Sequence, residues 1–471
     1  MKKTLLLLAI VALLAVPVTA LAATEFSLGG FIKLDTFWDS TQEGKNMNSQ
    51  IARNNSPAFQ HGRYFMTAQG SRFNFTIKGP KVWGATLTGF IEIDFDQDTE
   101  PGTSFRAGAT PSSVQPLNAS HGYVPRVRHA MFRLNWPATE LMMGQYWSMF
   151  CEYYPELLQD GPLQFHGVPT HRLAQVRVTQ KWCDLTFAGL IGVATDVNNV
   201  GPTDTTSLQW NGANSETPQI QAKVAYEKDL WGKAPFYGVP RGFVAQLVGG
   251  WQRNRFNRGS FTGTYFDADN NRLSTMTVMQ RDNQYLNAWM VQGTLFIPVL
   301  PTYSANLAGT ASLSAQWYVG AGLEAFGEAT SGNNSRWSLQ NWFYQYPEYD
   351  RTLSKHYGGY IQAQYYFTNQ WFINAVWGMD KTWGITKGRA DESDASREVF
   401  ASEPFRWWQE YSLALWYRPI TALKFGLQYS YNRTDYFMKT GPKPTSTPLY
   451  GQTLTDQGNA HRVEFVGLFF F

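Results

Sequence analysis

The chain ends in the stretch AHRVEFVGLFFF, residues 460–471, and the alternating pattern of this stretch decides the fold. One side of an extended strand here would be apolar, with Val463, Phe465, Gly467, Phe469 and Phe471. The other side begins with Arg462 and Glu464 and becomes apolar only near the end. Neighbouring residues of a strand point to opposite faces, so this segment wets one face and buries the other in an apolar medium. Because chain termini are usually exposed, three terminal phenylalanines indicate that this medium is lipid.

The opposite end of the chain, residues 1–22, has the three parts of a secretory signal peptide. Two lysines precede an apolar run from Leu5 to Val16, and Ala20-Leu21-Ala22 follows as a small-residue cleavage site. The apolar run is shorter than the ~20 residues that a membrane-spanning helix needs. The sequence therefore predicts export and a mature chain of residues 23–471, which we expect to form one domain.

The composition is unusually aromatic and nearly neutral. Aromatic residues make up 16% of the chain, the same share as charged residues, and the formal net charge is +3 at pH 7. Such a balance gives no overall field that would favour nucleic acid, so we expect no nucleic-acid partner. Beyond residue 22 there is no apolar run of ~18 residues. A chain of this kind either buries its rings in a soluble core or exposes them to lipid on alternate residues of strands.

The two-residue alternation recurs along the whole chain and predicts about sixteen strands. They lie near residues 26–39, 70–79, 84–96, 123–135, 140–148, 172–181, 184–194, 218–229, 241–253, 284–297, 309–323, 356–367, 371–380, 406–418, 421–432 and 460–471. Their connections alternate between short ones, such as residues 368–370, and long ones, such as residues 97–122. A soluble sandwich shows the same alternation along its strands, but nothing in that fold makes short and long connections alternate along the chain. The pattern predicts an all-β fold, a transmembrane antiparallel β-barrel with long loops on one rim.

Five features follow one another along the chain, namely GGFIKLDTFWD (29–39), FIEIDFD (90–96), VRHAMFRL (127–134), LMMGQYWSMF (141–150) and the terminal phenylalanine. In this order they resemble segments of Gram-negative outer-membrane porins, closest to the DcaP-like group, and the overall plan is similar to that of OmpJ-type porins. The resemblance implies that Phe465, Phe469 and Phe471 form a C-terminal signal for the barrel-assembly machinery. It also implies a homotrimer in the cell outer membrane, in contact with lipid and lipopolysaccharide.

The parity of the strands predicts which charged side chains line the lumen. With Phe73, Phe75 and Ile77 facing lipid, Arg72 on the same strand points inward. The pore-lining candidates found in this way are Lys33, Asp35, Arg72, Glu92, Asp94, Arg126, Arg128 and Arg177. Opposed acidic and basic rows across a narrow lumen would orient polar solutes, and the resemblance implies that Arg72 and Arg128 lie at the constriction. The alternative is that these charges pair with their neighbours and select nothing.

The connection at residues 149–172 corresponds to the third long loop of porins, which folds into the barrel and narrows it. The loop is rich in aromatic rings, with Phe150, Tyr153, Tyr154 and Phe165, and acidic at Glu152, Glu156 and Asp160. We expect it to fold inward, with its rings against the barrel wall and its carboxylates opposite the arginines. The alternative is that the rings pack among surface loops or at a subunit contact.

The sequence lacks the motifs of cofactor binding and catalysis. Cys151 and Cys183 fall on opposite rims of the predicted barrel, too far apart for a disulfide bond. There is no CxxCH haem-attachment motif, no HExxH zinc motif and no phosphate-binding loop. His129 is the one histidine inside a predicted strand with catalytic potential, and nothing places a nucleophile beside it. We therefore expect no cofactor and no enzymatic activity.

Two functions fit these predictions. The first is a water-filled channel for passive diffusion of small hydrophilic solutes or ions, with the lumen charges as its filter. The alternative is a barrel scaffold that sheathes or supports a partner such as an outer-membrane electron-transfer cytochrome, which would need a lumen cleared of the third loop. An energy-driven transporter is excluded, because about 22 strands and a plug do not fit in a chain of this length.

Overall fold

The computed structural model describes residues 24–41, 51, 53–55, 59, 61–95, 125–159, 163, 167–195, 212–256, 260–266, 272–279, 284–327, 353–385, 388–389, 406–436 and 455–471. The predicted signal peptide, residues 1–22, lies outside the described residues, as do Asp160 and Phe165.

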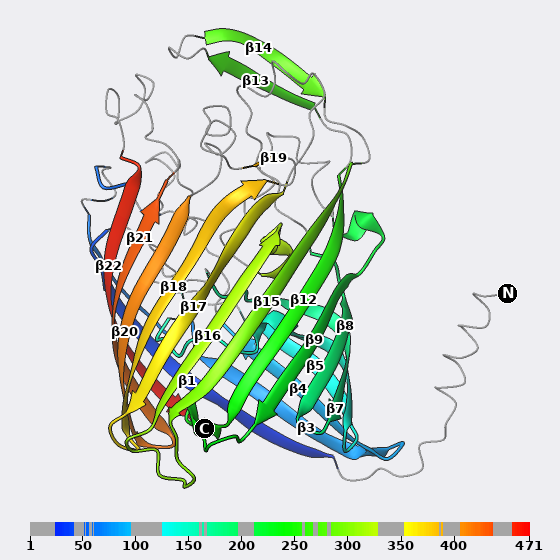
Figure 1. Ribbon diagram of the computed structural model, residues 1–471, viewed down its shortest axis with the longest axis vertical. Helices are drawn as coiled ribbons and strands as arrows, with labels where there is room; N and C mark the ends of the chain where they lie inside the picture. Colours follow the sequence, from blue (N-terminus) through cyan, green and yellow to red (C-terminus); the bar gives the residue numbers. More distant parts are fainter. Residues whose placement is uncertain are drawn as a thin grey trace, which may run out of the picture.

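Sixteen long antiparallel strands form one sheet that closes on itself into a barrel (Figure 1). They are β1 (Glu25–Asp39), β3 (Arg72–Val82), β4 (Ala85–Asp94), β5 (Arg126–Asn135), β6 (Thr139–Trp147), β7 (Arg172–Trp182), β8 (Leu185–Gly192), β9 (Gln219–Lys228), β12 (Phe243–Phe256), β15 (Gln284–Leu300), β16 (Ala311–Ala321), β17 (Ser354–Tyr366), β18 (Trp371–Ile385), β20 (Trp407–Ile420), β21 (Leu423–Asp435) and β22 (Gln457–Phe470). The barrel closes where β22 pairs with β1, from Phe31 opposite Phe470 to Asp39 opposite Arg462. The predicted fold class is confirmed.

Shorter elements extend or connect these strands. They are β2 (Arg63–Thr67), β10 (Ala234–Phe236), β11 (Val239–Arg241), β13 (Ser260–Phe266), β14 (Arg272–Met279), β19 (Gly388–Arg389) and the 3₁₀ turns η3 (Met149–Cys151), η5 (Ala213–Ser215) and η6 (Leu323–Phe326). β2 pairs with the end of β1, and β19 with the end of β18. Within the described residues, no helix is long and apolar enough to cross a membrane.

The outer surface of the barrel is an apolar band, and the inner surface is polar. Large apolar side chains are exposed on every long strand except β6, including Phe75, Ile91, Leu247, Leu413 and Phe465. Many of their neighbours in sequence point inward and are buried, and many of these are glutamine or charged. A soluble protein would bury these apolar side chains and expose the polar ones, so the alternation identifies the outer medium as lipid.

The two rims of the barrel differ. At the lower rim in Figure 1, strands are joined by tight turns such as Trp83–Gly84, whose backbone φ angles are 50° and 77°. These positive values match a two-residue hairpin turn, in which glycine has no side chain to strain. The strand ends joined by long connections lie at the upper rim. Short turns at one rim and long connections at the other are therefore as predicted.

The connection between β9 and β12 at the lower rim also packs inside the barrel. Between β9 and β12 the chain forms the small hairpin β10–β11, which folds into the barrel. The ring of Phe236 in this hairpin packs on Phe296 of the wall and on Tyr153, with ring centres 5.7 Å and 5.3 Å away. The sequence predicts only a connection at residues 230–240, between two strands. The hairpin supports the third loop from below.

Candidate functional site

The described part of the third loop, residues 148–159, 163 and 167–171, lies inside the barrel, as predicted. Its backbone is held by amide side chains that point inward from the wall. Gln221 of β9 accepts a hydrogen bond from the Met149 N–H at 2.8 Å, and Gln292 of β15 donates one to the Phe150 carbonyl at 3.1 Å. Further along the loop, Gln362 accepts from the Glu156 N–H at 2.7 Å and Gln428 from the Leu158 N–H at 2.9 Å. These bonds satisfy backbone groups that a buried loop would otherwise leave unpaired.

Three wall lysines hold the loop by charge. Lys223 of β9 lies 2.5 Å from a carboxylate oxygen of Glu152, and Lys424 of β21 forms a buried ion pair with Glu156. Lys33 of β1 donates a hydrogen bond to the Leu158 carbonyl at 2.9 Å. The loop therefore runs along the wall from β9 to β21 and reaches β1.

Apolar contacts complete the docking of the loop. The Phe150 ring packs on the Phe326 ring, with centres 5.5 Å apart, and lies over Gly250 of β12. A Cβ at Gly250 would lie 2.8 Å from Phe326 and 2.9 Å from Phe150, so only a residue without a side chain fits beneath these rings. Leu163 fits over Gly378 of β18 in the same way, with 2.4 Å to an added Cβ. Glycines in the wall thus make room for the rings and side chains of the loop.

The wall not covered by these contacts, β3 to β7, carries a cluster of arginines. Arg126 makes two hydrogen bonds to the Asp94 carboxylate, at 2.9 Å and 2.8 Å. Arg128 bridges Glu92 and Asp94, with 2.7 Å to each. A β-bulge at Arg128 explains this geometry, because β4 pairs Glu92 with His129 and Ile93 with Val127, which leaves Arg128 as the extra residue.

Two further arginines join this cluster and were missed by sequence analysis. Arg172 at the start of β7 stacks on the Trp147 ring at 5.0 Å, and Arg128 lies over the same ring at 5.5 Å. Arg133 of β5 stacks on Tyr146 at 4.8 Å. Arg172 lies within electrostatic range of Arg72, Arg126 and Arg128. Both arginines have the opposite parity to the predicted candidates, because Arg133 lies five positions after Arg128 and Arg172 five positions before Arg177. Strand parity alone therefore predicts an outward direction for both, and the bulge at Arg128 is what turns Arg133 inward.

The part of the loop that faces the arginines is aromatic. Tyr154 lies within electrostatic range of Arg72 and Arg128, and Tyr237 of the β10–β11 hairpin within range of Arg72. The two tyrosine rings pack against each other with centres 5.3 Å apart. The Tyr237 hydroxyl donates to the Pro155 carbonyl at 3.0 Å, which ties the hairpin to the loop. Arg72 and Arg128 of the wall and the tyrosines Tyr154 and Tyr237 of the interior are therefore neighbours, and we take this group as the candidate constriction.

This arrangement differs from the predicted one in its carboxylates. Glu156 does not lie opposite the arginines, because Lys424 of the covered wall binds it, and Glu152 is bound by Lys223 while also lying 3.8 Å from Arg177. The acidic partners of Arg126 and Arg128 are on the neighbouring strand instead. For these two arginines, arginine and carboxylate therefore alternate along one wall rather than facing each other across the lumen.

The remaining predicted pore-lining residues, Lys33, Asp35 and Arg177, also form ion pairs or hydrogen bonds. Lys33 lies 2.8 Å from Asp35 on its own strand, and both side chains are buried. Arg177 donates to the Trp147 carbonyl and to Gln175, and lies 3.8 Å from Glu152. Within the described residues no three histidine, cysteine, aspartate or glutamate side chains gather as a metal site.

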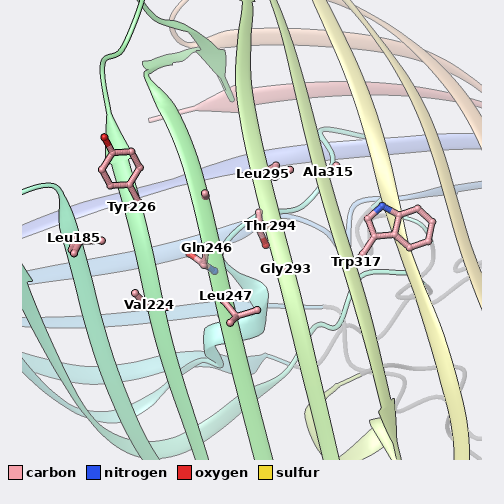
Figure 2. Close-up of a pocket in the computed structure, with 11 residues that line it drawn as sticks. Leu185, Val224, Tyr226, Gln246, Leu247, Gly293, Thr294, Leu295, Ala315 and Trp317 are labelled. Carbon is pink, nitrogen blue, oxygen red and sulfur yellow. The ribbon is translucent and has the colours of Figure 1, made fainter.

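A shallow groove of about 470 Å³ lies on the lipid-facing surface rather than in the lumen (Figure 2). Its walls are the outward side chains of Val224, Leu247 and Leu295, all exposed, and of Tyr226 and Trp317. Gly293 and the alanines of neighbouring strands form its floor. Nothing in this lining is arranged for chemistry, so the arginine–tyrosine constriction remains the candidate functional site.

Comparison with known proteins finds likeness in structure and not in sequence. No protein-family model matches the chain, and no curated protein is similar to it. The outer-membrane channel DcaP of Acinetobacter baumannii matches with a TM-score of 0.62 at 15% identity, over 96% of this chain and 99% of that chain. An anion-selective porin from Comamonas acidovorans matches with a TM-score of 0.47 at 10% identity, over 95% of this chain and 100% of that one. OprB of Pseudomonas putida gives 0.47 at 11% identity, over 95% and 94%.

The closed sixteen-stranded barrel with a loop packed inside it defines the fold as that of a porin. More particularly, the chain has the fold of the DcaP channel along nearly its whole length, which confirms the predicted DcaP-like resemblance at the level of the fold.

Proposed function

We propose that this protein is an outer-membrane porin, a water-filled channel for passive diffusion of small hydrophilic solutes or ions. The observation that carries the proposal is the docking of the third loop on one half of the wall, which leaves the arginine cluster of the other half facing Tyr154 and Tyr237. Fixed charges and hydroxyls around a narrow path favour polar solutes over apolar ones, because they replace part of the solute's hydration shell.

The charge balance of the constriction favours anionic solutes. Arg172 lies within electrostatic range of Arg72, Arg126 and Arg128, and two carboxylates, Glu92 and Asp94, pair with Arg126 and Arg128. The group therefore keeps a formal charge of about +2. In a site with an effective dielectric constant near 20, unit charges 4 Å apart interact by about 4 kcal/mol, against about 1 kcal/mol in water.

Planar lipid bilayers test this function directly. Purified protein is expected to give stepwise conductance in KCl, and in a salt gradient the current should reverse toward the equilibrium potential of chloride. Purified, folded protein that inserts into the bilayer without conducting would contradict the channel function. Reversal at the potassium potential would contradict only the preference for anions.

The scaffold function is not favoured by the contacts of the third loop. A barrel that sheathes a cytochrome needs a lumen wide enough for a protein, whereas this loop is bonded to β9, β15, β17 and β21 across the interior. Displacing it would break buried ion pairs and hydrogen bonds.

We also propose that the protein is not an enzyme. His129, the predicted catalytic candidate, lies against the rings of Tyr146 and Trp147. His356 comes closer to a catalytic arrangement, 2.6 Å from Asp380 and 3.4 Å from Thr382. These three side chains are buried in the barrel wall, where no substrate could reach the hydroxyl.

The export, membrane location and oligomeric state of the protein are part of the same proposal. We propose a mature domain of residues 23–471 that is delivered by a cleaved signal peptide, inserted by the barrel-assembly machinery and surrounded by outer-membrane lipid and lipopolysaccharide. We propose a homotrimer, with part of the outward aromatic surface at the subunit interface. Native mass measured in mild detergent checks the trimer, and a monomer would contradict it.

A further inference from the structure

A row of alternating lysines and aromatic rings lies at the long-loop rim of β17, β18 and β20. Tyr357 pairs with Lys381 across the first two strands, and Lys381 pairs with Trp407 across the next two. The Lys381 ammonium lies 5.6 Å from the centre of the Trp407 ring and 6.0 Å from that of Tyr357. The Lys355 ammonium lies 5.2 Å from the centre of the Trp383 ring. We call these five residues the lysine–aromatic row.

The row faces outward. The sequence neighbours His356, Asp380 and Trp408 are fully buried inside the barrel, so Lys355, Lys381 and Trp407 on either side of them point to the outer surface. Trp383 is 39% exposed. Aromatic rings at this height of a membrane barrel mark the boundary between hydrocarbon and headgroups, so the two ammonium groups lie at headgroup level.

Neither lysine has an acidic partner within the described part of the chain. The carboxylates of Asp380 and Glu410 on the neighbouring strands belong to the lumen side, where Asp380 accepts hydrogen bonds from Tyr318 and His356, and Glu410 accepts from Gln159 and Ser412. Stacking on rings holds an ammonium group in place but does not neutralise it. Among the described residues, no carboxylate therefore neutralises these two ammonium groups at the membrane boundary.

We propose that Lys355 and Lys381 bind the phosphate of an outer-leaflet lipid, held between Trp383, Tyr357 and Trp407. A lipid fits better than a free anion, because the same strands continue toward the membrane centre with exposed apolar side chains such as Ile361 and Leu413. The phosphate would pair with the lysines while the acyl chains cover this apolar surface. The proposal rests on the membrane location of the barrel and not on its channel activity.

The test measures lipid binding to the purified barrel in detergent by native mass spectrometry. The probes are lipid A with two phosphates and the same lipid after removal of its phosphates. The wild type should bind the phosphorylated lipid about thirtyfold more tightly than the dephosphorylated one, and Lys355→Gln with Lys381→Gln should abolish this difference. The double arginine variant, Lys355→Arg with Lys381→Arg, should retain it.

The matched control is Lys228→Gln, which removes one lysine at the opposite rim, where Lys228 pairs with Asp184 at 2.8 Å. It should bind phosphorylated lipid A like the wild type. Equal binding of the two lipids by the wild type overturns the proposal without any variant, as does unchanged binding by the double glutamine variant. Inorganic phosphate that competes as well as lipid A would show a free-anion site and would overturn it too. Conductance of the same samples reports separately on the channel.

Discussion

At the scale of single residues, the position of Arg128 shows how the barrel builds its constriction. The bulge makes Arg128 the extra residue of β5, and the carboxylates of Glu92 and Asp94 on β4 then hold the guanidinium in place. Arg128 is 6% exposed, so little water screens its charge. A side chain fixed in this way acts as a constant part of the local field rather than as a mobile counter-ion.

Neutralising two arginines should therefore change ion selectivity. In Arg72→Gln with Arg128→Gln, the constriction keeps Arg126 and Arg172 against two carboxylates, so its formal charge falls from about +2 to about 0. We expect the reversal potential in a KCl gradient to move toward cation preference by tens of millivolts in the channels that assemble, and the loss of the buried Arg128 ion pairs to lower the stability of the barrel. Unchanged selectivity would mean that these arginines do not line the narrowest part of the path.

Phe75→Arg is the matched variant on the opposite face of β3. Phe75 is 44% exposed on the outer surface, so the new charge would meet hydrocarbon. We expect a loss of stability of about 2–4 kcal/mol near the bilayer midplane and unchanged selectivity in any channel that still forms. Urea unfolding and the heat-induced gel shift measure this cost, and normal stability would contradict the assignment of inside and outside.

The two cysteines should differ sharply in reactivity. Burial raises the pKa of the Cys151 thiol in the third loop to about 11, so at pH 8 about one thiol in a thousand is the reactive thiolate. Cys183 is exposed in a turn at the lower rim. Maleimide should therefore label one site per folded chain at pH 8 and none in Cys183→Ser. Rapid labelling of Cys151 in that variant would show that the loop leaves the lumen.

At the scale of elements, the strands were predictable and the interior packing was not. Each long strand has a two-residue period of apolar and polar side chains, imposed by lipid on one side and water on the other. In β22 the apolar side of this period continues to the last residues. The loop contacts depend on wall residues such as Gln221 and Gln428, which parity places inside the barrel without saying what they bind. The carboxylates were misassigned for the same reason, since Lys424 lies 268 positions from Glu156 in the sequence.

The docking of the third loop should depend on single buried ion pairs. In Lys424→Ala, Glu156 would lose its cation while 2% exposed, and breaking a buried pair in this way costs about 3–5 kcal/mol. We expect the loop to pack less firmly around Glu156 and the single-channel conductance to rise. Lys228→Ala, which breaks an exposed pair at the rim, should leave the conductance unchanged. Equal conductance in both variants would mean that the loop does not limit the current.

At the scale of the whole molecule, closure depends on the last strand. The pairing of β22 with β1 reaches Gly30 and Phe471, which exchange two hydrogen bonds of 3.2 Å. Deleting residues 460–471 would leave β21 and β1 with unpaired edges in lipid, where each unpaired backbone group is costly. We expect no heat-modifiable barrel in the outer membrane from this truncation. A normal gel shift would contradict the assembly role of Phe465, Phe469 and Phe471.

The docking of the third loop also sets an order of events in time. The loop is made early in the chain, but Gln428, which binds Leu158, comes 270 residues later, and Gln362, which binds Glu156, comes 206 residues later. Until those strands have joined the sheet, the loop has nothing to bind, and its rings and carboxylates stay outside their final places. A half-built barrel is therefore ungated, and the channel acquires its narrow passage only as the last strands close.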